Sequence, residues 1–301
     1  MKALVTGATG FIGRALLARL EAPRVLSRDP IRAGVALGRD VEAFPWEPAA
    51  GPPPAAAFEG VEAVFHLAGD SVGEGRWTTA KKAAIRDSRV AGTRNLVAGM
   101  AALPRRPRVL VSASAVGWYG DRGDEVLDER APHAGDFLGT VCADWEAEAR
   151  RAEGAGVRVV CLRIGVVLGP GGGALRKMLL PFRLGVGSPL GSGRQWMPWI
   201  HRDDLVGLAL HAAATESLSG PVNAVAPLPV TNREFTKALG RALHRPTFFP
   251  PVPAFVLRAA LGEFSGVLLG STRAVPRAAE RAGYAFRHPD LGEALRDCLG
   301  E

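Results

Sequence analysis

Three glycines near the start of the chain constrain its fold more than any other feature. Gly7, Gly10 and Gly13 follow an apolar strand predicted at 2–6 and open a helix predicted at 11–20. In a dinucleotide-binding βα unit, the first glycine permits the tight turn, the second lets the backbone approach a pyrophosphate, and the third lets helix and strand pack closely. Free N–H groups at the helix N-terminus favour the phosphates. This turn therefore predicts a dinucleotide site, and a glycine-rich turn without a ligand is the alternative.

Strand-like apolar runs alternate with helical periodicity along the first half of the chain. This alternation predicts an α/β fold with a Rossmann-type, doubly wound parallel sheet. After residue 169 the chain becomes rich in glycine and proline and predicts a smaller C-terminal lobe for the substrate. We expect a nucleotide-binding domain of residues 1–168 plus about 200–226, and a lobe of about 169–199 and 227–301. The predicted strands are 24–26, 41–44, 63–67, 108–112, 157–167, 198–200 and 222–225, and the main predicted helices are 79–100, 139–153, 203–214 and 254–261.

Charge and composition exclude several classes of partner. The net charge of +7 comes from scattered arginines that are interleaved with acidic residues, so no basic patch for nucleic acid is predicted. No apolar run is long enough to cross a bilayer, and the N-terminus lacks the features of a signal peptide. The three cysteines are widely spaced, and we expect neither His66 nor His201 to belong to a cluster of metal ligands. We expect a cytoplasmic protein that binds a small molecule and no metal.

The residues after the second strand favour NADP over NAD. NAD enzymes place an acidic residue at this point to hold the ribose 2′-hydroxyl. Here the strand ends in Ser27 and Arg28, and a guanidinium can bind the 2′-phosphate of NADP with charge-assisted hydrogen bonds. Asp29 is the competing candidate, one position further on, and Arg28 as an ordinary surface residue is the other alternative.

Several motifs in the right order resemble the extended short-chain dehydrogenase/reductase superfamily. They include TGATGFIG, VFHLAG, VAGTRNL and SASAVGWYGD, although an Asn expected just before VAGTRNL is Arg89 here. GRWTTAKKAAIRDSRVAGT, GRQWMPWIH, PLPVTNREF and PVPAFVLRAALGE resemble its atypical, nucleotide-sugar-epimerase-related branch, which has a small C-terminal domain. The resemblance adds the VFHLAG segment to the cofactor site. The predicted cofactor contacts are Gly7, Thr9, Gly10, Phe11, Ile12, Gly13, Ser27, Arg28, Leu67, Ala68 and Gly69.

The catalytic pair that the resemblance implies is missing. Members of the superfamily use a Tyr and a Lys four residues later; the Lys lowers the Tyr pKa and holds the cofactor ribose. The matching positions fall near Leu138 and Cys142, which can do neither job. Ser114 matches the serine that orients the substrate. Tyr119 is the only tyrosine near that strand, so we weigh it as a replacement acid against the alternative that it packs the sheet edge.

The substrate side departs from the sugar-nucleotide epimerases as well. The arginine expected before Ile200–His201 is replaced by Trp196 or Met197, so a UDP-sugar is less expected. The predicted substrate contacts are Arg76, Trp77, Arg163, Trp196 and Trp199. Core packing is the alternative for the tryptophans, and a structural salt bridge is the alternative for Arg163.

Two functions follow from these observations. One is an NADP(H)-dependent oxidoreductase or epimerase-like enzyme that acts on a small carbonyl or hydroxyl compound, with sugar-like compounds among the candidates. The other is a non-catalytic NADP(H)-binding sensor or regulatory protein, which the missing Tyr–Lys pair favours. The resemblance also implies a homodimer, paired through the helices predicted at 79–100 and 139–153.

Overall fold

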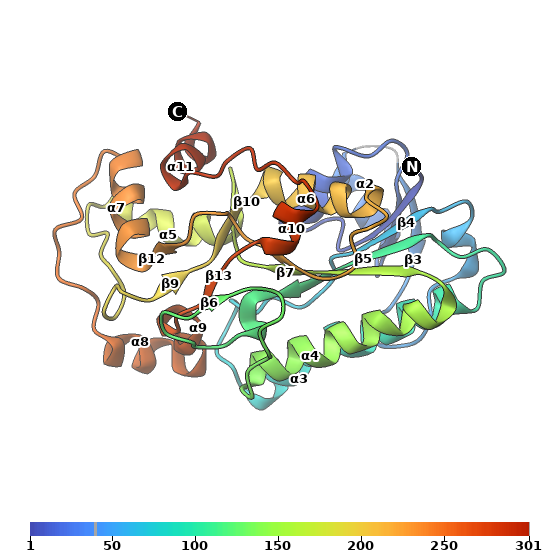
Figure 1. Cartoon of the computed structure of the whole chain (residues 1–301), viewed down its shortest axis with the longest axis horizontal. Helices are drawn as coiled ribbons and strands as arrows, with labels where there is room; N and C mark the ends of the chain where they lie inside the picture. Colours follow the sequence, from blue (N-terminus) through green and yellow to red (C-terminus); the bar gives the residue numbers. More distant parts are fainter. Residues whose placement is uncertain (39–40, 301) are drawn as a thin grey trace.

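A seven-stranded parallel sheet forms one end of the molecule. The computed structural model describes residues 1–38 and 41–300, and Figure 1 shows the sheet at one end and residues 227–261 at the opposite end. The strand order is β11-β7-β5-β4-β1-β2-β3, and every neighbouring pair is parallel. The strands are β1 (Ala3–Thr6), β2 (Arg24–Ser27), β3 (Glu42–Pro45), β4 (Ala63–His66), β5 (Val109–Ala115), β7 (Arg158–Ile164) and β11 (Gly220–Ala224).

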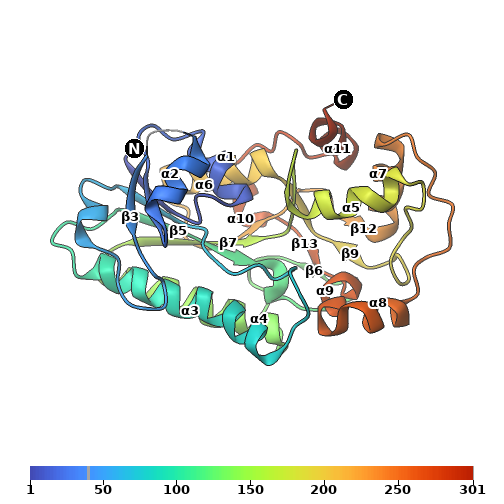
Figure 2. The same ribbon diagram turned by 180° about the vertical axis from the view of Figure 1, so that it is seen from behind.

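Helices cover both faces of this sheet, as Figures 1 and 2 show. On one face lie α3 (Thr79–Ala101) and α4 (Phe137–Arg150); on the other lie α1 (Phe11–Leu17), α2 (Pro30–Leu37) and α6 (Arg202–Ala214). Successive side chains of a strand point to opposite faces. Accordingly, Leu4 packs in the core under α3, while its neighbour Val5 packs in the core under α1 and α6. The predicted doubly wound parallel sheet is confirmed.

Capping residues explain where the helices begin. Asp29 caps α2 by accepting a hydrogen bond from the Arg32 backbone N–H, and Gly38 ends that helix in the left-handed conformation. Asp136 caps α4 in the same way, so this helix begins before the predicted start at residue 139. It ends in a 3₁₀ turn, η3 (Arg151–Ala155).

A third apolar core lies in the C-terminal half, where Phe182, Trp199 and Phe235 are buried together. Three short strand pairs lie outside the main sheet. They are β8 (Val166–Leu168) with β10 (Trp199–His201), β9 (Trp196–Met197) with β12 (Val230–Thr231), and β6 (Val126–Leu127) with β13 (Arg273–Ala274). The predicted division into two domains remains a prediction. Ala278 and Ala279, which belong to the predicted C-terminal lobe, pack into the core of the main sheet. The remaining elements are η1 (Ala55–Phe58), η2 (Val116–Trp118), β6 (Val126–Leu127), β8 (Val166–Leu168), α5 (Gly173–Arg183), β9 (Trp196–Met197), β10 (Trp199–His201), β12 (Val230–Thr231), α7 (Asn232–Ala242), α8 (Ala254–Leu261), η4 (Gly262–Phe264), α9 (Ser265–Leu269), β13 (Arg273–Ala274), α10 (Arg277–Arg281) and α11 (Leu291–Leu299).

A buried carboxylate fastens the C-terminal segment to the sheet domain. Asp204 of α6 is fully buried and accepts hydrogen bonds from the backbone N–H groups of Arg287 (2.7 Å) and His288 (2.9 Å). The Tyr284 hydroxyl donates to the backbone carbonyl of Asp204 at 2.8 Å.

None of the helices within the described ranges is both long enough and apolar enough to span a membrane.

Candidate active site

The turn between β1 and α1 accepts only glycine at two of its positions. Gly7 has φ +69°, and a Cβ there would lie 2.7 Å from the Leu67 carbonyl carbon. A Cβ on Gly13 would lie 2.3 Å from the Gly7 carbonyl oxygen. Both distances are far inside van der Waals contact, so the turn, the helix start and the segment after β4 pack backbone against backbone.

A buried chain of hydroxyl and imidazole groups holds the segment after β4 against this turn. The Thr6 hydroxyl oxygen accepts the backbone N–H groups of Leu67 and Ala68, both at 3.2 Å. Its own proton therefore goes to His66 Nδ1 (2.7 Å), and His66 Nε2 donates to the Thr93 hydroxyl (2.9 Å). Burial, with a smaller effect of Arg89, lowers the pKa of His66 to about 4, so the ring is neutral at pH 7.

Thr6 and Thr93 were missed by the sequence reasoning. The one available signal was a threonine that ends a strand of otherwise apolar residues directly before the glycine turn. Their partnership with His66 joins residues 60 and 27 positions apart in the chain, which only the fold reveals.

A cavity of about 460 Å³ lies over the glycine turn. It is lined on one side by five of the predicted cofactor residues, in the turn and the first residues of α1, and by Leu67 and Val72 from the loop after β4. Its far wall comes from β8 and the start of α5. The Phe11 ring packs against the glycine-rich loop, because a Cβ on Gly172 would lie 2.5 Å from it. The lining residues are Gly7, Gly10, Phe11, Ile12, Gly13, Leu67, Val72, Val167, Gly173 and Ala174.

At the end of β2, Arg28 has no hydrogen-bond or ion-pair partner among residues 1–38 and 41–300. The Asp29 carboxylate, the competing candidate for the ribose contact, is engaged as the cap of α2. The Ser27 hydroxyl bonds with the backbone of Asp29, at 3.0 Å as donor and 3.2 Å as acceptor. Arg28 lies exposed beside them. The position can therefore accept a phosphate, and it offers no free carboxylate to a ribose diol.

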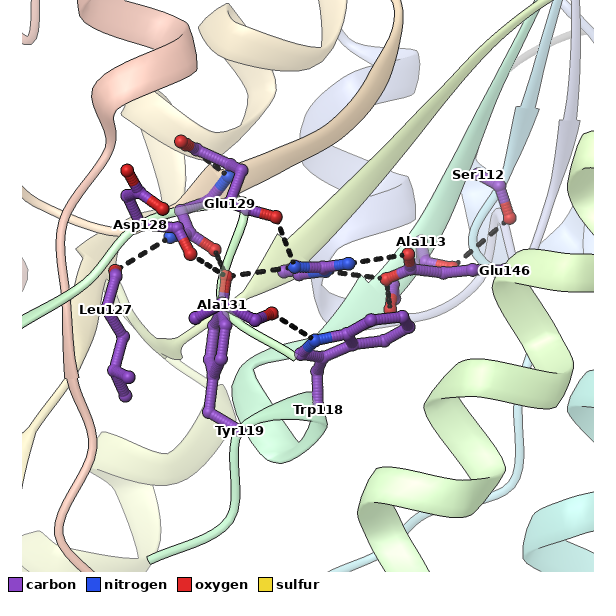
Figure 3. A network of polar contacts seen from close by, with 12 residues as sticks. Ser112, Ala113, Trp118, Tyr119, Leu127, Asp128, Glu129, Ala131 and Glu146 are labelled. Carbon is purple, nitrogen blue, oxygen red and sulfur yellow. Dashed lines mark hydrogen bonds and ion pairs between the residues drawn. The ribbon is translucent and has the colours of Figure 1, made fainter. Parts of the chain in front are cut away.

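Ser114 lies at the carboxyl end of β5 and is almost completely buried. Its hydroxyl donates to Glu146 Oε1 at 2.7 Å. Glu146 in turn forms a two-pronged ion pair with Arg163, with distances of 2.9 Å and 3.0 Å (Figure 3). Because the Ser114 proton is held by Glu146, its oxygen can offer an approaching ligand a lone pair.

Tyr119 does not face a ligand, so its prediction as a catalytic acid is wrong. The side chain is 0% exposed, and its hydroxyl donates to Asn223 Oδ1 at 2.6 Å (Figure 3). The same hydroxyl oxygen accepts from Arg163 Nη1 at 3.1 Å. Burial raises the pKa of Tyr119 to about 12. The alternative reading, a tyrosine that packs the sheet edge, is the correct one.

Arg163 and Trp199 are also structural, which corrects their prediction as substrate contacts. Arg163 is 2% exposed, pairs with Glu146, and stacks its guanidinium 3.7 Å from the centre of the Trp118 ring. Trp199 is 1% exposed within the C-terminal core. Sequence alone could not separate these roles, because β7 and β10 both end near the predicted site.

The other substrate candidates lie closer to the surface. Trp77 is half-buried, donates its indole N–H to the Val72 carbonyl at 2.9 Å, and packs edge-on against Phe137. Trp196 is half-buried too, but its indole N–H is bonded to Asp124 and Arg273 lies over its ring. Trp77 therefore stands beside a cavity-lining residue, whereas the partners of Trp196 belong to the loop around β6 and to β13.

The loop that carries Arg76 and the start of α3 contact the C-terminal half through three exposed polar contacts and through the Trp77 and Phe264 rings, whose centres are 5.9 Å apart. Arg76 donates to the Ala259 carbonyl at 3.3 Å, and Lys177 donates to the Gly73 carbonyl at 2.8 Å. Lys82, near the start of α3, pairs with Glu263 at 2.9 Å. These contacts hold the loop between β4 and α3 next to α5 and α8.

Leu138 and Cys142, the two positions that the resemblance implies for the catalytic pair, both lie in the first turns of α4. Leu138, at the start of α4, packs against Gly117 just after β5. Cys142, one turn further along, is buried beside Ser114, and burial raises the pKa of its thiol to about 12. Neither side chain supplies a titrating phenol or a cation to this site.

The structure corrects the expectation that His201 has no potential metal ligands near it. Within the described ranges, His201, His288 and Asp297 place their ligand atoms within 4.8 Å of one another. The contacts of His201 are structural: its Nδ1 accepts the Asp203 N–H at the start of α6, and its Nε2 lies 3.1 Å from Asp297. Burial, and then the neighbouring His288, lowers the pKa of His201.

Sequence comparison agrees with this geometry. The model of the NAD dependent epimerase/dehydratase family matches residues 3–224. The chain belongs to this family. A second model, a domain of unknown function (DUF1731), matches residues 252–298, as expected for the small C-terminal domain. The resemblance to the extended short-chain dehydrogenases/reductases is confirmed.

Relatives within the epimerase family match almost the whole chain. An epimerase family protein of Mycobacterium bovis is 44% identical over 97% of this chain and 95% of its own length. The human epimerase family protein SDR39U1 is 37% identical over 99% of this chain and 100% of its own length.

Solved structures confirm the fold. The crystal structure of human SDR39U1 (isoform 2) with NADPH superposes with a TM-score of 0.89 at 36% identity and covers 100% of both chains. UDP-glucuronic acid 4-epimerase from Bacillus cereus, in complex with UDP-glucuronic acid and NAD, has a TM-score of 0.79 at 16% identity, covering 100% of this chain and 98% of its own. At that identity the likeness concerns the fold alone.

Proposed function

We propose that this chain is a cytoplasmic NADP(H)-dependent oxidoreductase or epimerase-like enzyme that acts on a small carbonyl or hydroxyl compound. The observation that carries the proposal is the cavity over the glycine turn, which has Gly10 on its floor and Arg28 exposed at the adjacent end of β2. Membership of the epimerase family and the NADPH in the human SDR39U1 crystal structure support it.

Each group of residues has a distinct part in this proposal. The backbone N–H groups at the start of α1 hold the diphosphate, and Arg28, with Ser27, binds the adenosine 2′-phosphate. The segment from Leu67 to Gly69 lies against the adenosine side. NADP(H), when bound, supplies the hydride acceptor or donor. The proposed cofactor contacts are Gly7, Thr9, Gly10, Phe11, Ile12, Gly13, Ser27, Arg28, Leu67, Ala68 and Gly69.

The substrate side is proposed from fewer residues. Ser114 accepts a hydrogen bond from the substrate hydroxyl, since its own proton is held by Glu146. Arg76 and Trp77 line the approach from the loop after β4, with Trp196 further away. The lobe of about 169–199 and 227–301 covers this side of the cofactor.

A non-catalytic NADP(H) sensor is the second candidate. It is favoured by the side chains beside Ser114: Leu138 and Cys142 stand in the two catalytic positions, and the Tyr119 hydroxyl is fully engaged elsewhere. Under this function, cofactor occupancy changes the contacts between the two halves of the molecule and no hydride is transferred.

Titration with NADPH and NADH tests the cofactor assignment. We expect the wild-type chain to bind NADPH more tightly than NADH, and Arg28→Glu to reverse the preference, because it replaces the cation by a carboxylate that suits a ribose diol. Arg32→Glu, on the exposed face of the same loop and helix, is the control. Unchanged selectivity in Arg28→Glu would overturn the assignment of Arg28.

Hydride transfer separates the enzyme from the sensor. NADPH carrying deuterium at the nicotinamide C4 is incubated with a panel of aldehydes, ketones and keto sugars, and the products are analysed by mass spectrometry. Incorporation of deuterium in the wild-type chain, reduced in Ser114→Ala, supports the enzyme. Tight NADPH binding with no transfer to any member of the panel supports the sensor.

A further inference from the structure

Glu146 is a buried carboxylate that contacts the serine at the end of β5. It lies on α4, is 5% exposed, and accepts the Ser114 hydroxyl proton through Oε1 at 2.7 Å (Figure 3). Arg163 donates to both of its oxygens, at 2.9 Å and 3.0 Å. An ionised carboxylate can only accept hydrogen bonds, so the direction of the Ser114 bond is fixed. The Ser114 oxygen therefore presents lone pairs, and no proton, to an approaching ligand.

Glu146 shares a helix face with the two positions of the missing catalytic pair. Leu138, Cys142 and Glu146 recur at intervals of four residues, so their side chains project from the same side of α4. Leu138 packs against Gly117 just after β5, and both Cys142 and Glu146 contact Ser114. The face that presents an alkyl group and a thiol in its first two turns therefore presents a carboxylate in the third, in contact with the serine.

Arg163 is held by groups other than Glu146. Its Nη1 donates to the Glu129 carbonyl and to the Tyr119 hydroxyl, both at 3.1 Å, and its guanidinium carbon lies 3.7 Å from the centre of the Trp118 ring. A guanidinium stays protonated in proteins. If Glu146 takes up a proton, Arg163 therefore remains a hydrogen-bonded and stacked cation in the same place.

We infer that Glu146 is the proton acceptor of the site, reached through Ser114, and that the substrate is an alcohol. A substrate carbon loses a hydride to NADP⁺, the O–H bond of the hydroxyl on that carbon breaks, and its proton passes to Ser114 Oγ. The Ser114 proton passes at the same time to Glu146 Oε1. The alcohol is oxidised to a carbonyl compound, NADP⁺ is reduced to NADPH, and Glu146 ends neutral and later returns its proton to water. Glu146 acts through Ser114 and is thus a positioning residue.

This inference rests on the proposed function, because it requires NADP(H) and a substrate at Ser114. It conserves the charge of the site. Hydride uptake removes the positive charge of the nicotinamide ring, and protonation of Glu146 leaves the positive charge of Arg163 without its counter-ion. No net charge is therefore created in a region where burial makes an isolated charge costly.

The direction of the Ser114 hydrogen bond also disfavours a carbonyl ligand. A carbonyl oxygen would face the Ser114 oxygen as one acceptor against another, whereas an alcohol can donate its proton. A purely structural role, in which Glu146 only neutralises Arg163, is the competing explanation. That role predicts no preference between an alcohol and the matching carbonyl compound.

Equilibrium binding without turnover separates the two explanations. The probes are the carbonyl compound of the panel that takes up most deuterium and the alcohol formed from it. The alcohol is titrated into the chain with NADPH and the carbonyl compound into the chain with NADP⁺, since neither mixture can react. We expect Glu146→Gln to lower the ratio of alcohol affinity to carbonyl affinity about tenfold, because an amide can donate to Ser114 and free its proton for a carbonyl.

Turnover supplies the second readout. A group that takes up a proton in the reaction contributes about 100-fold or more to the rate. We therefore expect kcat for oxidation of the alcohol to fall by about that factor in Glu146→Gln. The dissociation constant of NADPH should not change, because Glu146 lies behind Ser114 and is not proposed to contact the cofactor.

Glu148→Gln is the matched control. Glu148 lies two residues further along α4, on a different face of the helix, is 6% exposed and pairs with Arg94 at 2.6 Å. Its replacement removes an equally buried, ion-paired carboxylate and should leave the affinity ratio and kcat unchanged. Circular dichroism and melting temperature establish that each variant is folded. If Glu146→Gln does not fold, the double variant Glu146→Gln with Arg163→Met, which removes both charges of the pair, is measured instead.

The outcomes separate the inference from the function on which it rests. A wild-type chain that transfers hydride to no member of the panel overturns both. Hydride transfer by the wild type, with the affinity ratio and kcat unchanged in Glu146→Gln, overturns the role of Glu146 and leaves the enzyme standing. Equal losses in Glu146→Gln and Glu148→Gln indicate a general distortion and also overturn it. A lower ratio and a lower kcat at unchanged NADPH affinity, in Glu146→Gln alone, support it.

Discussion

At the scale of single residues, Tyr119 shows that a residue's place in the sequence does not fix the direction in which its side chain points. Its hydroxyl meets Asn223, which lies 104 residues away, and Arg163 from the neighbouring strand. The motif around Ser114 predicted where the tyrosine would be but could not predict that its hydroxyl would point into the protein. No local sequence pattern shows that a side chain will be buried among residues that are distant in the chain. For the same reason the sequence assigned Trp199 and Arg163 to the ligand, although both are buried.

Replacing Tyr119 by phenylalanine should affect stability and not binding. Tyr119→Phe removes a buried hydroxyl and leaves Arg163 and Asn223 each short of one partner, so we expect a loss of about 1–3 kcal/mol in the free energy of unfolding. NADPH affinity should not change. Urea denaturation and cofactor titration measure the two effects. Weaker NADPH binding or lost turnover at unchanged stability would return Tyr119 to the active site.

The buried imidazole of His66 makes stability depend on pH. Its pKa is about 4 in the folded chain and about 6.5 in the unfolded chain, so the unfolded state takes up a proton first as the pH falls. The neutral imidazole therefore contributes about 3 kcal/mol to the free energy of unfolding above pH 6.5. This contribution is lost as the pH falls from 6.5 to 4.

Urea denaturation of the wild type and of His66→Gln at pH 7.5 and 4.5 measures this dependence. Because acidic groups titrate in both proteins, the difference between the two pH profiles isolates His66. We expect the gap between wild type and variant to narrow at the lower pH. Parallel profiles would mean that the imidazole is already charged or that its environment is open to water.

At the scale of elements, the sequence predicted most of the architecture because each signal was local. The glycine turn, the buried strands and the long helix α3 follow from spacing and periodicity over a few residues. The start of α4 at Phe137 was missed because it depends on Asp136 as a cap, outside the periodic stretch. The Thr6–His66 bond was missed because it joins two strands.

Replacing Gly10 should leave folding intact and weaken cofactor binding. A Cβ there would meet only the Gly7 carbonyl oxygen, at 3.2 Å, yet Gly10 is exposed and lines the cavity. Gly10→Ala should therefore fold and bind NADPH about tenfold more weakly, because the methyl group stands where the diphosphate approaches.

Gly34→Ala in α2 provides the control for this change. A Cβ on Gly34 would meet none of the described residues within 4 Å, so the variant should keep the NADPH affinity and gain up to about 1 kcal/mol from helix propensity. Isothermal titration calorimetry on both variants measures the affinities. Equal affinity in Gly10→Ala and Gly34→Ala would show that no ligand passes over Gly10.

At the scale of the whole molecule, Asp204 connects the C-terminal chain to the sheet domain. Asp204→Ala leaves the N–H groups of Arg287 and His288 without their buried acceptor, and we expect a loss of about 2–4 kcal/mol. Hydrogen exchange should accelerate at residues 284–290. Asp203→Ala, next to it but 41% exposed, should cost under about 1 kcal/mol. Similar losses in the free energy of unfolding of both variants would contradict the role of Asp204 in connecting the C-terminal chain.

The homodimer expected through α3 and α4 remains a prediction. The two helices pack against each other on one face of the sheet and are linked by ion pairs between Arg86 and Asp144 and between Arg94 and Glu148. Solution mass by light scattering measures the oligomeric state.

The three polar contacts that attach the Arg76 loop and the start of α3 to α5, α8 and η4 are formed at the surface. Exposed pairs such as that between Lys82 and Glu263 contribute little free energy and are weakened by salt. Separating the loop from the C-terminal half is therefore inexpensive compared with unfolding either core. Added salt should consequently loosen this attachment, while the backbone packing between Gly7, Gly13 and Leu67, which contains no charged group, should be much less sensitive to salt.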